Sequence, residues 1–212
     1  MILPFFSGFS QTNLPFKEWN SVNLNPYVLY ISGDGGFNEF STGLCNAIHR
    51  RGYSVAAVNA KSYFWNKKTP EKTTADITST LEKKFVNRKN QQLILVGYSF
   101  GADVMPFIVN RLPGEIKNKL LSVILLSPST STDFEVHWTD MFSSNRKRSM
   151  DVIAEMNKME QLKTITIIGV NENHFPIEEI RLKNYTNEIL PGGHDFDGNS
   201  EEVAKTLIKY FK

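Results

Sequence analysis

The sequence predicts an α/β fold with a mainly parallel central sheet and helices on both of its faces. Short runs rich in Val, Ile and Leu alternate with segments of helical spacing, which is typical of strands buried in such a sheet. One of these runs, residues 93–98, leads through Ser99 directly into a helical pattern. Ligands of such sheets bind beyond the carboxyl ends of the strands, so we expect a site at that edge.

Length and composition are those of a globular chain, and we expect residues 1–212 to form one domain. Hydrophobic residues make up 41% and charged residues 22% of the 212 positions, and a net charge of +2 gives no reason to expect a nucleic-acid partner. Residues 1–25 are expected to be an irregular extension or an edge strand. Cys45 is the only cysteine, and its apolar neighbours predict a core position.

Two sequence features bear on location. No apolar run approaches the roughly 18 residues of a membrane span. The opening segment Met1-Ile2-Leu3-Pro4-Phe5-Phe6 is too short for a signal peptide and has no basic flank. A cytoplasmic location and a removed signal peptide therefore both stay open.

Strand patterns recur along the chain, separated by turn residues and helix patterns. In order, the strands are expected at residues 27–31, 53–59, 93–98, 121–126, 164–169 and 185–190. The first strand ends in a glycine-rich loop at 33–36, and the second in an aromatic loop at 61–65. An irregular insertion is expected from about 129 to 150.

The helices between these strands are expected from apolar residues at helical spacing. Such residues stand at 40, 44, 47 and 48, at 75, 77, 81 and 85, at 104, 107, 108 and 112, over 152–159, and at 203, 207, 208 and 211. Gly52 is placed to end the first helix. Thr69 and Pro70 are placed to open the second as a cap and a first-turn proline.

Residues 97–101, Gly-Tyr-Ser-Phe-Gly, match a nucleophile elbow, in which a strand turns sharply into a helix and carries a serine at the turn. The positions two before and two after the serine must lack side chains, and Gly97 and Gly101 meet that need. The elbow leaves the Phe100 amide free to bind an oxyanion. Ser99 is therefore the expected nucleophile and Phe100 an expected oxyanion-hole residue.

A serine becomes a good nucleophile only when a base takes its proton, and four histidines are candidates. His194 lies in a glycine-rich loop after the last strand, which gives the order nucleophile, acid, histidine that is typical of α/β-hydrolases. His49 follows Ile48 in a helix pattern and is expected on the surface or packed. His137 and His174 lie in loops, where an accessory role stays open. We therefore expect His194 to be the base.

The acid of a triad must lie within hydrogen-bond reach of the other imidazole nitrogen. Glu172 leaves the strand that precedes the histidine strand, and we favour it for that reason. Asp133 and Glu135, which follow an earlier strand, are the alternatives. Asp195 and Asp197 lie too close to the histidine in sequence to orient its ring easily.

The segment Gly33-Asp34-Gly35-Gly36 occupies the position from which such a hydrolase supplies its second oxyanion N–H. Asp34 or Gly35 is expected to donate it. The segment lacks the full pattern of a phosphate-binding glycine loop. The histidines and acidic residues also lack metal-ligand spacing, so we expect neither a metal nor another cofactor.

Together these motifs resemble the bacterial virulence protein family VirJ and the carboxyl-terminal domain of AcvB. The matching residues extend from about Tyr27 to the end of the chain. They are Ser32-Gly33-Asp34-Gly35-Gly36-Phe37, Tyr63-Phe64-Trp65 with Thr69-Pro70-Glu71 and Asp76, Gly97 to Val104 with Pro106, Asn110-Arg111-Leu112-Pro113, Phe134-Glu135, and Pro191-Gly192-Gly193-His194 with Phe196-Asp197.

The resemblance implies an α/β-hydrolase fold and a periplasmic location in bacteria with two membranes. For AcvB-like members it implies hydrolysis of aminoacylated phosphatidylglycerol, typically lysyl-phosphatidylglycerol, and VirJ-like members are also linked to type IV secretion. Carried over by position, Ser99 resembles the nucleophile and His194 the base. Glu172 matches an acidic position after the penultimate strand.

The leading hypothesis is a serine esterase with an α/β-hydrolase fold and a reduced lid, acting on aminoacyl-phosphatidylglycerol. Asp34 would face the ammonium group of the acyl part, and Tyr63, Phe64 and Trp65 would form an amphipathic wall or lipid contact. The alternative is that Asp34 caps its own loop and the aromatic side chains fill the core.

Two other functions stay open: a non-catalytic binding component linked to type IV secretion or envelope assembly, and an esterase or thioesterase of small acyl esters.

The basic clusters Lys67-Lys68 and Arg146-Lys147-Arg148 lie in polar stretches. We expect them in solvated loops, with peripheral contact to an anionic membrane as the alternative.

Overall fold

A seven-stranded sheet forms the centre of the protein in a computed structural model that describes residues 14–86, 88–137, 148–172 and 175–212. Its strands lie in the order β1-β3-β2-β4-β5-β8-β9. Their bounds are β1 (Phe16–Trp19), β2 (Tyr27–Ile31), β3 (Val55–Val58), β4 (Leu93–Tyr98), β5 (Leu120–Leu126), β8 (Thr164–Gly169) and β9 (Tyr185–Leu190). The neighbouring pairs are parallel except for the edge strand β1, which runs antiparallel to β3.

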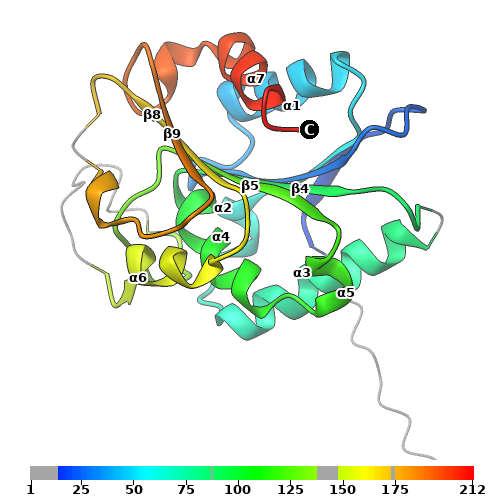
Figure 1. The fold of residues 1–212 in the computed structure, drawn as a ribbon, viewed down its shortest axis with the longest axis horizontal. Helices are drawn as coiled ribbons and strands as arrows, with labels where there is room; N and C mark the ends of the chain where they lie inside the picture. The colour runs from blue at the N-terminus through cyan, green and yellow to red at the C-terminus, as the bar shows by residue number, and fades with distance from the viewer. Residues whose placement is uncertain (1–13, 87, 138–147, 173–174) are drawn as a thin grey trace, which may run out of the picture.

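Helices cover both faces of this sheet, as the sequence predicts. In Figure 1, α1 and α7 lie on one side of the sheet, while α2 to α6 lie on the other. The helices are α1 (Glu39–Arg50), α2 (Ala60–Tyr63), α3 (Pro70–Phe85), α4 (Phe100–Arg111), α5 (Gly114–Lys117), α6 (Val152–Met156) and α7 (Ser200–Ile208). Short 3₁₀ helices are η2 (Asn157–Met159), η3 (Ile177–Glu179) and η4 (Phe196–Gly198), and β6 (Ser131–Thr132) pairs with β7 (Met150–Asp151) outside the main sheet.

Two buried clusters, one on each side of the sheet, explain the continuous apolar runs of the strands. Along β2, Val28 and Tyr30 belong to the cluster under α1 and α7, whereas Leu29 and Ile31 belong to the one that contains residues of α3 and α4. Successive side chains of a strand point to opposite faces, so a strand covered on both faces is apolar at every position. Each such side chain contributes about 1.5–3 kcal/mol by leaving water.

The expected helix boundaries at Thr69 and Gly52 are confirmed. The Thr69 hydroxyl accepts a hydrogen bond from the Lys72 amide at 3.1 Å, and Pro70 is the first residue of α3. Gly52 has a φ of 89° and donates its amide to the His49 carbonyl at 2.8 Å, which closes α1. A left-handed φ of this kind favours glycine.

The segment expected as an aromatic loop at 61–65 is in part a helix. The Asn59 side chain accepts a hydrogen bond from the Ser62 amide at 3.1 Å and so caps the short helix α2. This cap joins Asn59, which follows β3, to the first turn of α2. Helix α2 has only four residues, so its sequence shows no helical periodicity that could predict it. Helix α5 and the β6–β7 pair are equally short and were not expected.

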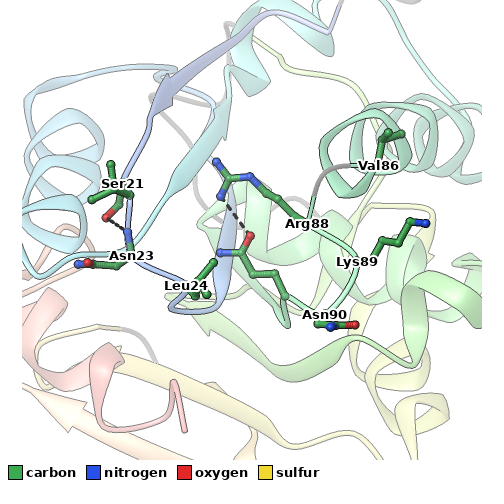
Figure 2. Close-up of a pocket in the computed structure, with 9 residues that line it drawn as sticks. Ser21, Asn23, Leu24, Val86, Arg88, Lys89 and Asn90 are labelled. Carbon is green, nitrogen blue, oxygen red and sulfur yellow. Dashed lines mark hydrogen bonds between the residues drawn. The ribbon is translucent and has the colours of Figure 1, made fainter.

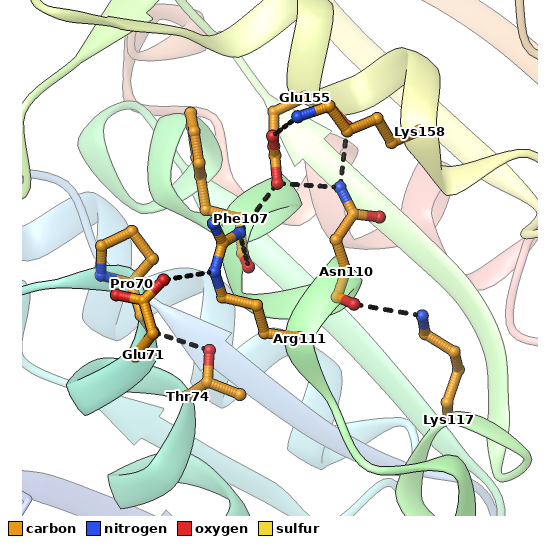
Figure 3. A network of polar contacts seen from close by, with 9 residues as sticks. All are labelled: Pro70, Glu71, Thr74, Phe107, Asn110, Arg111, Lys117, Glu155 and Lys158. Atoms are coloured by element: carbon orange, nitrogen blue, oxygen red, sulfur yellow. Dashed lines mark hydrogen bonds and ion pairs between the residues drawn. The ribbon is translucent and has the colours of Figure 1, made fainter.

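A polar network joins three helices on the side of the sheet that carries α4 (Figure 3). Arg111, at the end of α4, bonds Glu71 of α3 at 2.9 Å and Glu155 of α6 at 2.8 Å. The Glu155 carboxylate, whose side chain is 6% exposed, also accepts hydrogen bonds from Asn110 at 3.1 Å and Lys158 at 2.5 Å. A buried carboxylate is tolerated only with such partners, so the network fixes the far end of the helix that begins at Ser99.

No helix in the part of the chain that the structure describes is long and apolar enough to cross a membrane.

Candidate active site

Ser99 stands at the sharp turn between β4 and α4. Its φ of 52° and ψ of −121° lie outside the regions that ordinary residues favour, as expected of a strained nucleophile turn. A Cβ on Gly97 would lie 2.4 Å from the Gly101 carbonyl oxygen, and one on Gly101 would lie 2.2 Å from that of Ile31. Both glycines are therefore required by close backbone packing, for the reason the sequence predicts.

The structure brings Ser99, His194 and Glu172 together in one hydrogen-bonded chain. The Ser99 Oγ lies 2.8 Å from His194 Nε2, and His194 Nδ1 lies 2.6 Å from Glu172 Oε1. The ionised carboxylate can only accept, so Nδ1 carries a proton and donates it. In the neutral imidazole Nε2 is then the acceptor, and the serine hydroxyl donates to it.

Glu172 is held by more than the histidine. Its second oxygen, Oε2, accepts the Gly169 amide at 2.7 Å and the Ser127 hydroxyl at 2.8 Å. Burial raises the pKa of Glu172, but the hydrogen bonds from His194, Gly169 and Ser127 outweigh it, and the pKa lies below its ordinary value. The carboxyl is therefore ionised at neutral pH and available to orient the imidazole.

The pKa of His194 is shifted in the opposite direction, above its ordinary value. The hydrogen bond that His194 donates to Glu172 raises the pKa of His194 above its ordinary value of 6.5, burial lowers it, and the charges of Glu172, Asp103 and Asp34 raise it further. His194 nevertheless has a side chain that is 57% exposed. A basic and accessible imidazole beside the serine hydroxyl is what proton abstraction requires.

The two rival acids lie away from this histidine. Asp133 pairs with another imidazole, His137 Nε2, at 2.8 Å, and with Arg148 at 3.2 Å. Both ring nitrogens of His194 are engaged by Ser99 and Glu172, so neither Asp133 nor Glu135 serves it.

The glycine loop passes directly beside the nucleophile. A Cβ on Gly33 would lie 3.2 Å from the Ser99 Cβ, and the Gly36 amide bonds the Gly33 carbonyl at 3.0 Å. This turn has Asp34 and Gly35 at its centre, close to the serine. At the other side, Phe100 is the first residue of α4, where amides have no partner within the helix. The roles of Phe100, Asp34 and Gly35 in an oxyanion hole stay predictions.

The charges acting on the rings of the site are acidic. Asp195, Glu172 and Asp34 each raise the pKa of Tyr98, after burial, and Glu172, Asp103 and Asp34 raise that of His194. The rings of Tyr98 and His194 lie 5.8 Å apart. The acidic side chains that act on these two rings are thus Asp34, Asp103, Glu172 and Asp195.

The expectation that Tyr63 and Phe64 face a substrate is wrong for their side chains. Phe64 is fully buried, with ring centroids 5.0 Å from Phe100 and 5.8 Å from Phe134, and Tyr63 donates its hydroxyl to Asp76 at 2.6 Å. Both lie in the core, and the 134–136 segment packs against Phe64 through the Phe134 ring and a hydrogen bond from the Val136 amide to the Phe64 carbonyl at 3.0 Å. Trp65, by contrast, is 51% exposed.

Two polar residues of the site were not expected from the sequence. Ser127 follows β5, has a φ of 48° and bonds Glu172, and Asp103 is a carboxylate only 7% exposed, one turn along α4 from Ser99. The sequence signals were present: Ser127 stands at the carboxyl end of a buried strand, and Asp103 interrupts the apolar face of the elbow helix.

Other expected residues fall outside this cluster. His49 bonds the Tyr53 carbonyl within the α1 end at 3.2 Å. His174, Arg146 and Lys147 lie outside the described residues. Nowhere in the described ranges do three His, Cys, Asp or Glu side chains form a group that could hold a metal ion.

A cavity of about 620 Å³ lies at the opposite end of the sheet, between the segments that lead into β2 and β4 (Figure 2). Ser21 to Leu24, Val86 and residues 88–91 line it. Arg88 donates to the Gln91 side chain at 3.1 Å across this region. None of these described lining residues is a histidine, cysteine or carboxylate, so the lining offers Ser21 no imidazole or carboxylate as a general base.

Comparisons with known proteins agree with the α/β fold. A family model described as bacterial virulence protein (VirJ) matches residues 25–212. The putative non-heme bromoperoxidase BpoC from Mycobacterium tuberculosis has a TM-score of 0.66 at 16% identity, with 94% of this chain and 96% of that chain covered. MGS-MChE2, an α/β hydrolase from a sediment metagenome of the lagoon of Mar Chica, has a TM-score of 0.64 at 16% identity, covering 92% and 93%.

A third solved structure, Est1E from Butyrivibrio proteoclasticus, has a TM-score of 0.60 at 14% identity and covers 88% of each chain. At these identities the likeness shows the fold, which is that of the α/β-hydrolases. The search of curated proteins gave no match.

Proposed function

The chain belongs to the VirJ family of bacterial virulence proteins, and from that premise we propose that it is a serine hydrolase of carboxylic esters. The observation that carries the proposal is the chain of two hydrogen bonds, 2.8 Å and 2.6 Å long, from Ser99 through His194 to Glu172. A nucleophile, a base and an orienting acid in this order are the parts that acyl transfer needs. The strained elbow that presents Ser99 and the open face of the imidazole support the same function.

In the proposed mechanism, His194 Nε2 takes the Ser99 proton as Oγ attacks the ester carbonyl carbon. The carbonyl oxygen becomes an oxyanion, which the Phe100 amide and an amide of the glycine loop stabilise. The tetrahedral intermediate then collapses, the bond to the leaving alcohol breaks, and His194 gives that alcohol its proton. Water attacks the acyl-enzyme in the same way, with His194 as base, and the acid product leaves.

We propose that the substrate is an aminoacyl ester, and specifically aminoacyl-phosphatidylglycerol such as lysyl-phosphatidylglycerol. The family resemblance implies this lipid, and the acidic surroundings of the site support a cationic acyl group. The position of Asp34 supports that role, because it is partly buried, follows Gly33 next to Ser99, and acts on the pKa of both Tyr98 and His194. Exposed Trp65 is the aromatic side chain left to contact lipid.

Replacing Asp34 by Asn is expected to raise KM for a lysyl ester about fivefold and to leave KM for a neutral acyl ester of the same alcohol unchanged. The substitution removes one charge facing the ammonium group, and a partly solvated charge pair is worth about 1 kcal/mol. The backbone amide, and with it any oxyanion contact, stays in place. Steady-state kinetics on the two esters measures the effect.

Glu160→Gln is the matched control, because this exposed carboxylate precedes β8 at the opposite end of the sheet. It should leave both KM values unchanged. An equal rise for the lysyl and the neutral ester in Asp34→Asn would contradict charge recognition by Asp34 while leaving the hydrolase itself intact.

The same proposal includes a periplasmic location and peripheral contact with an anionic membrane. The family resemblance implies the location, and a lipid substrate requires access to a bilayer surface. Exposed Lys67 follows Trp65 closely in the chain, so the two could meet such a surface together. Cell fractionation and vesicle sedimentation with and without anionic lipid test these two points, and type IV secretion components are candidate partners for co-purification.

A further inference from the structure

Two contacts outside the triad connect its members to each other. The Ser127 hydroxyl lies 2.8 Å from Glu172 Oε2 and 3.0 Å from the His194 carbonyl oxygen. Ser127 is 2% exposed and follows directly on β5. A hydroxyl has one proton, so it donates to one of these oxygens at a time, and both belong to the acid and base of the proposed triad.

The next contact lies two residues further along the chain. The Ser129 amide and hydroxyl donate to the two oxygens of the Asp103 carboxylate, each at 2.6 Å. Asp103 stands on the elbow helix, and its own amide bonds the Ser99 carbonyl at 3.0 Å. The segment after β5 is thus held to the acid at one end and to the nucleophile helix at the other.

These contacts close a ring. It runs from Ser99 to His194, on to Glu172 and Ser127, through Pro128 to Ser129, and back by Asp103 to the Ser99 backbone. Pro128 is the connecting residue, and its ring fixes its own φ angle. This limits how far Ser127 and Ser129 can move apart. A closed ring with a short and stiff link fixes the distance between its members better than separate contacts do.

We propose that the segment Ser127-Pro128-Ser129 is a clasp that aligns the acid and base with the nucleophile, with Ser127 and Asp103 as its positioning residues. This inference rests on the proposed hydrolase function, since it assigns the clasp to the same site. Ser127 acts through Glu172 by keeping the carboxylate against the imidazole. Asp103 acts through Ser129 by holding the clasp to the helix that carries Ser99.

A double-mutant cycle tests the Ser127 part. Ser127→Ala is expected to lower kcat about tenfold with KM unchanged, because a hydrogen bond to a charged group is worth about 1.5–3 kcal/mol and Gly169 still holds the carboxylate. In a Glu172→Ala background the same substitution should change kcat by less than about twofold, since the carboxylate through which Ser127 acts is gone and only its bond to the His194 carbonyl remains. An equal loss in both backgrounds would overturn the clasp and leave only a structural role.

Ser122→Ala is the matched control. Ser122 is a buried serine of β5, the strand that Ser127 follows, and its hydroxyl donates to the Tyr210 carbonyl at 3.1 Å, outside the ring. It loses one buried hydrogen bond as Ser127→Ala does, so it should leave kcat unchanged. A tenfold loss in this control would show that any such defect in β5 reduces activity.

Two substitutions test the Asp103 part. Asp103→Ala removes both bonds to Ser129 and is expected to lower kcat about tenfold, whereas Asp103→Asn keeps an oxygen for the Ser129 amide and should retain most activity. Rates are compared well above the pKa of Asp103, which burial raises to about 7 while its two bonds from Ser129 lower it. Equal losses would assign the effect to the Asp103 charge and would contradict the clasp.

A measurement that does not depend on catalysis tests the clasp separately from the hydrolase function. The imidazole of His194 is titrated by NMR in wild type, Ser127→Ala and Glu172→Ala. A clasp predicts that its pKa falls in Ser127→Ala part of the way to that of Glu172→Ala. An unchanged pKa overturns the clasp, while a folded wild type that hydrolyses no ester contradicts the function and leaves the titration as the test of the clasp.

Discussion

Replacing Ser99 by Ala is expected to lower kcat on an aminoacyl ester by about 10⁴- to 10⁶-fold, the largest effect of any single substitution in the chain. The substitution removes the oxygen that lies 2.8 Å from His194 Nε2, and no acyl-enzyme can then form. Alanine tolerates the φ of 52° no worse than serine does, so the elbow should keep its shape. Steady-state hydrolysis and thermal unfolding measure the two expectations.

Ser79→Ala, on the partly exposed face of α3, controls for the loss of a hydroxyl and should behave as wild type. Hydrolysis by Ser99→Ala at more than about a tenth of the wild-type rate would contradict its role as nucleophile. Such a result would favour a mechanism in which water attacks the ester directly, with His194 as the general base.

Replacing Glu172 by Ala is expected to lower kcat by about 10³- to 10⁴-fold and to move the acid limb of the pH profile to lower pH. The acid limb reports the protonation of His194, because only the neutral imidazole accepts the serine proton. The hydrogen bond to Glu172 is the main cause that raises the pKa of His194 above 6.5. Its removal lets burial dominate, so the pKa of His194, and the limb with it, falls.

Asp133→Ala is a control matched in chemistry, since Asp133 also pairs with an imidazole, at 2.8 Å from His137 Nε2. It should retain the wild-type rate and the wild-type acid limb. A larger loss in Asp133→Ala than in Glu172→Ala would show that the wrong carboxylate is assigned to the triad.

The fold and the elbow could be predicted because their signals are local. Gly97 and Gly101 are demanded by backbone contacts within a few residues of Ser99 and with the neighbouring strand β2. The alternation of apolar strands and amphipathic helices likewise follows from a sheet that is covered on both faces. The match of residues 25–212 to the VirJ model confirms the resemblance that the motifs indicate.

The rest depends on contacts between distant parts of the chain. The position of Glu172 beside His194 depends on how the ends of β5, β8 and β9 meet, which brings Ser127 and Glu172 to the histidine loop from positions far apart in sequence. The sequence of residues 63–65 is equally compatible with a lipid contact and with a core position, and only the packed structure shows that Tyr63 and Phe64 are buried. Single-sequence patterns carry no signal for such long-range packing.

Covalent labelling of the active serine tests the central claim most directly. The wild type is treated with a fluorophosphonate probe, and the modified residue is identified by mass spectrometry. The proposed triad predicts one adduct on Ser99, absent in Ser99→Ala and formed much more slowly in Glu172→Ala. A folded wild type that forms no adduct, or one that carries it on another residue, would contradict a serine hydrolase built on Ser99.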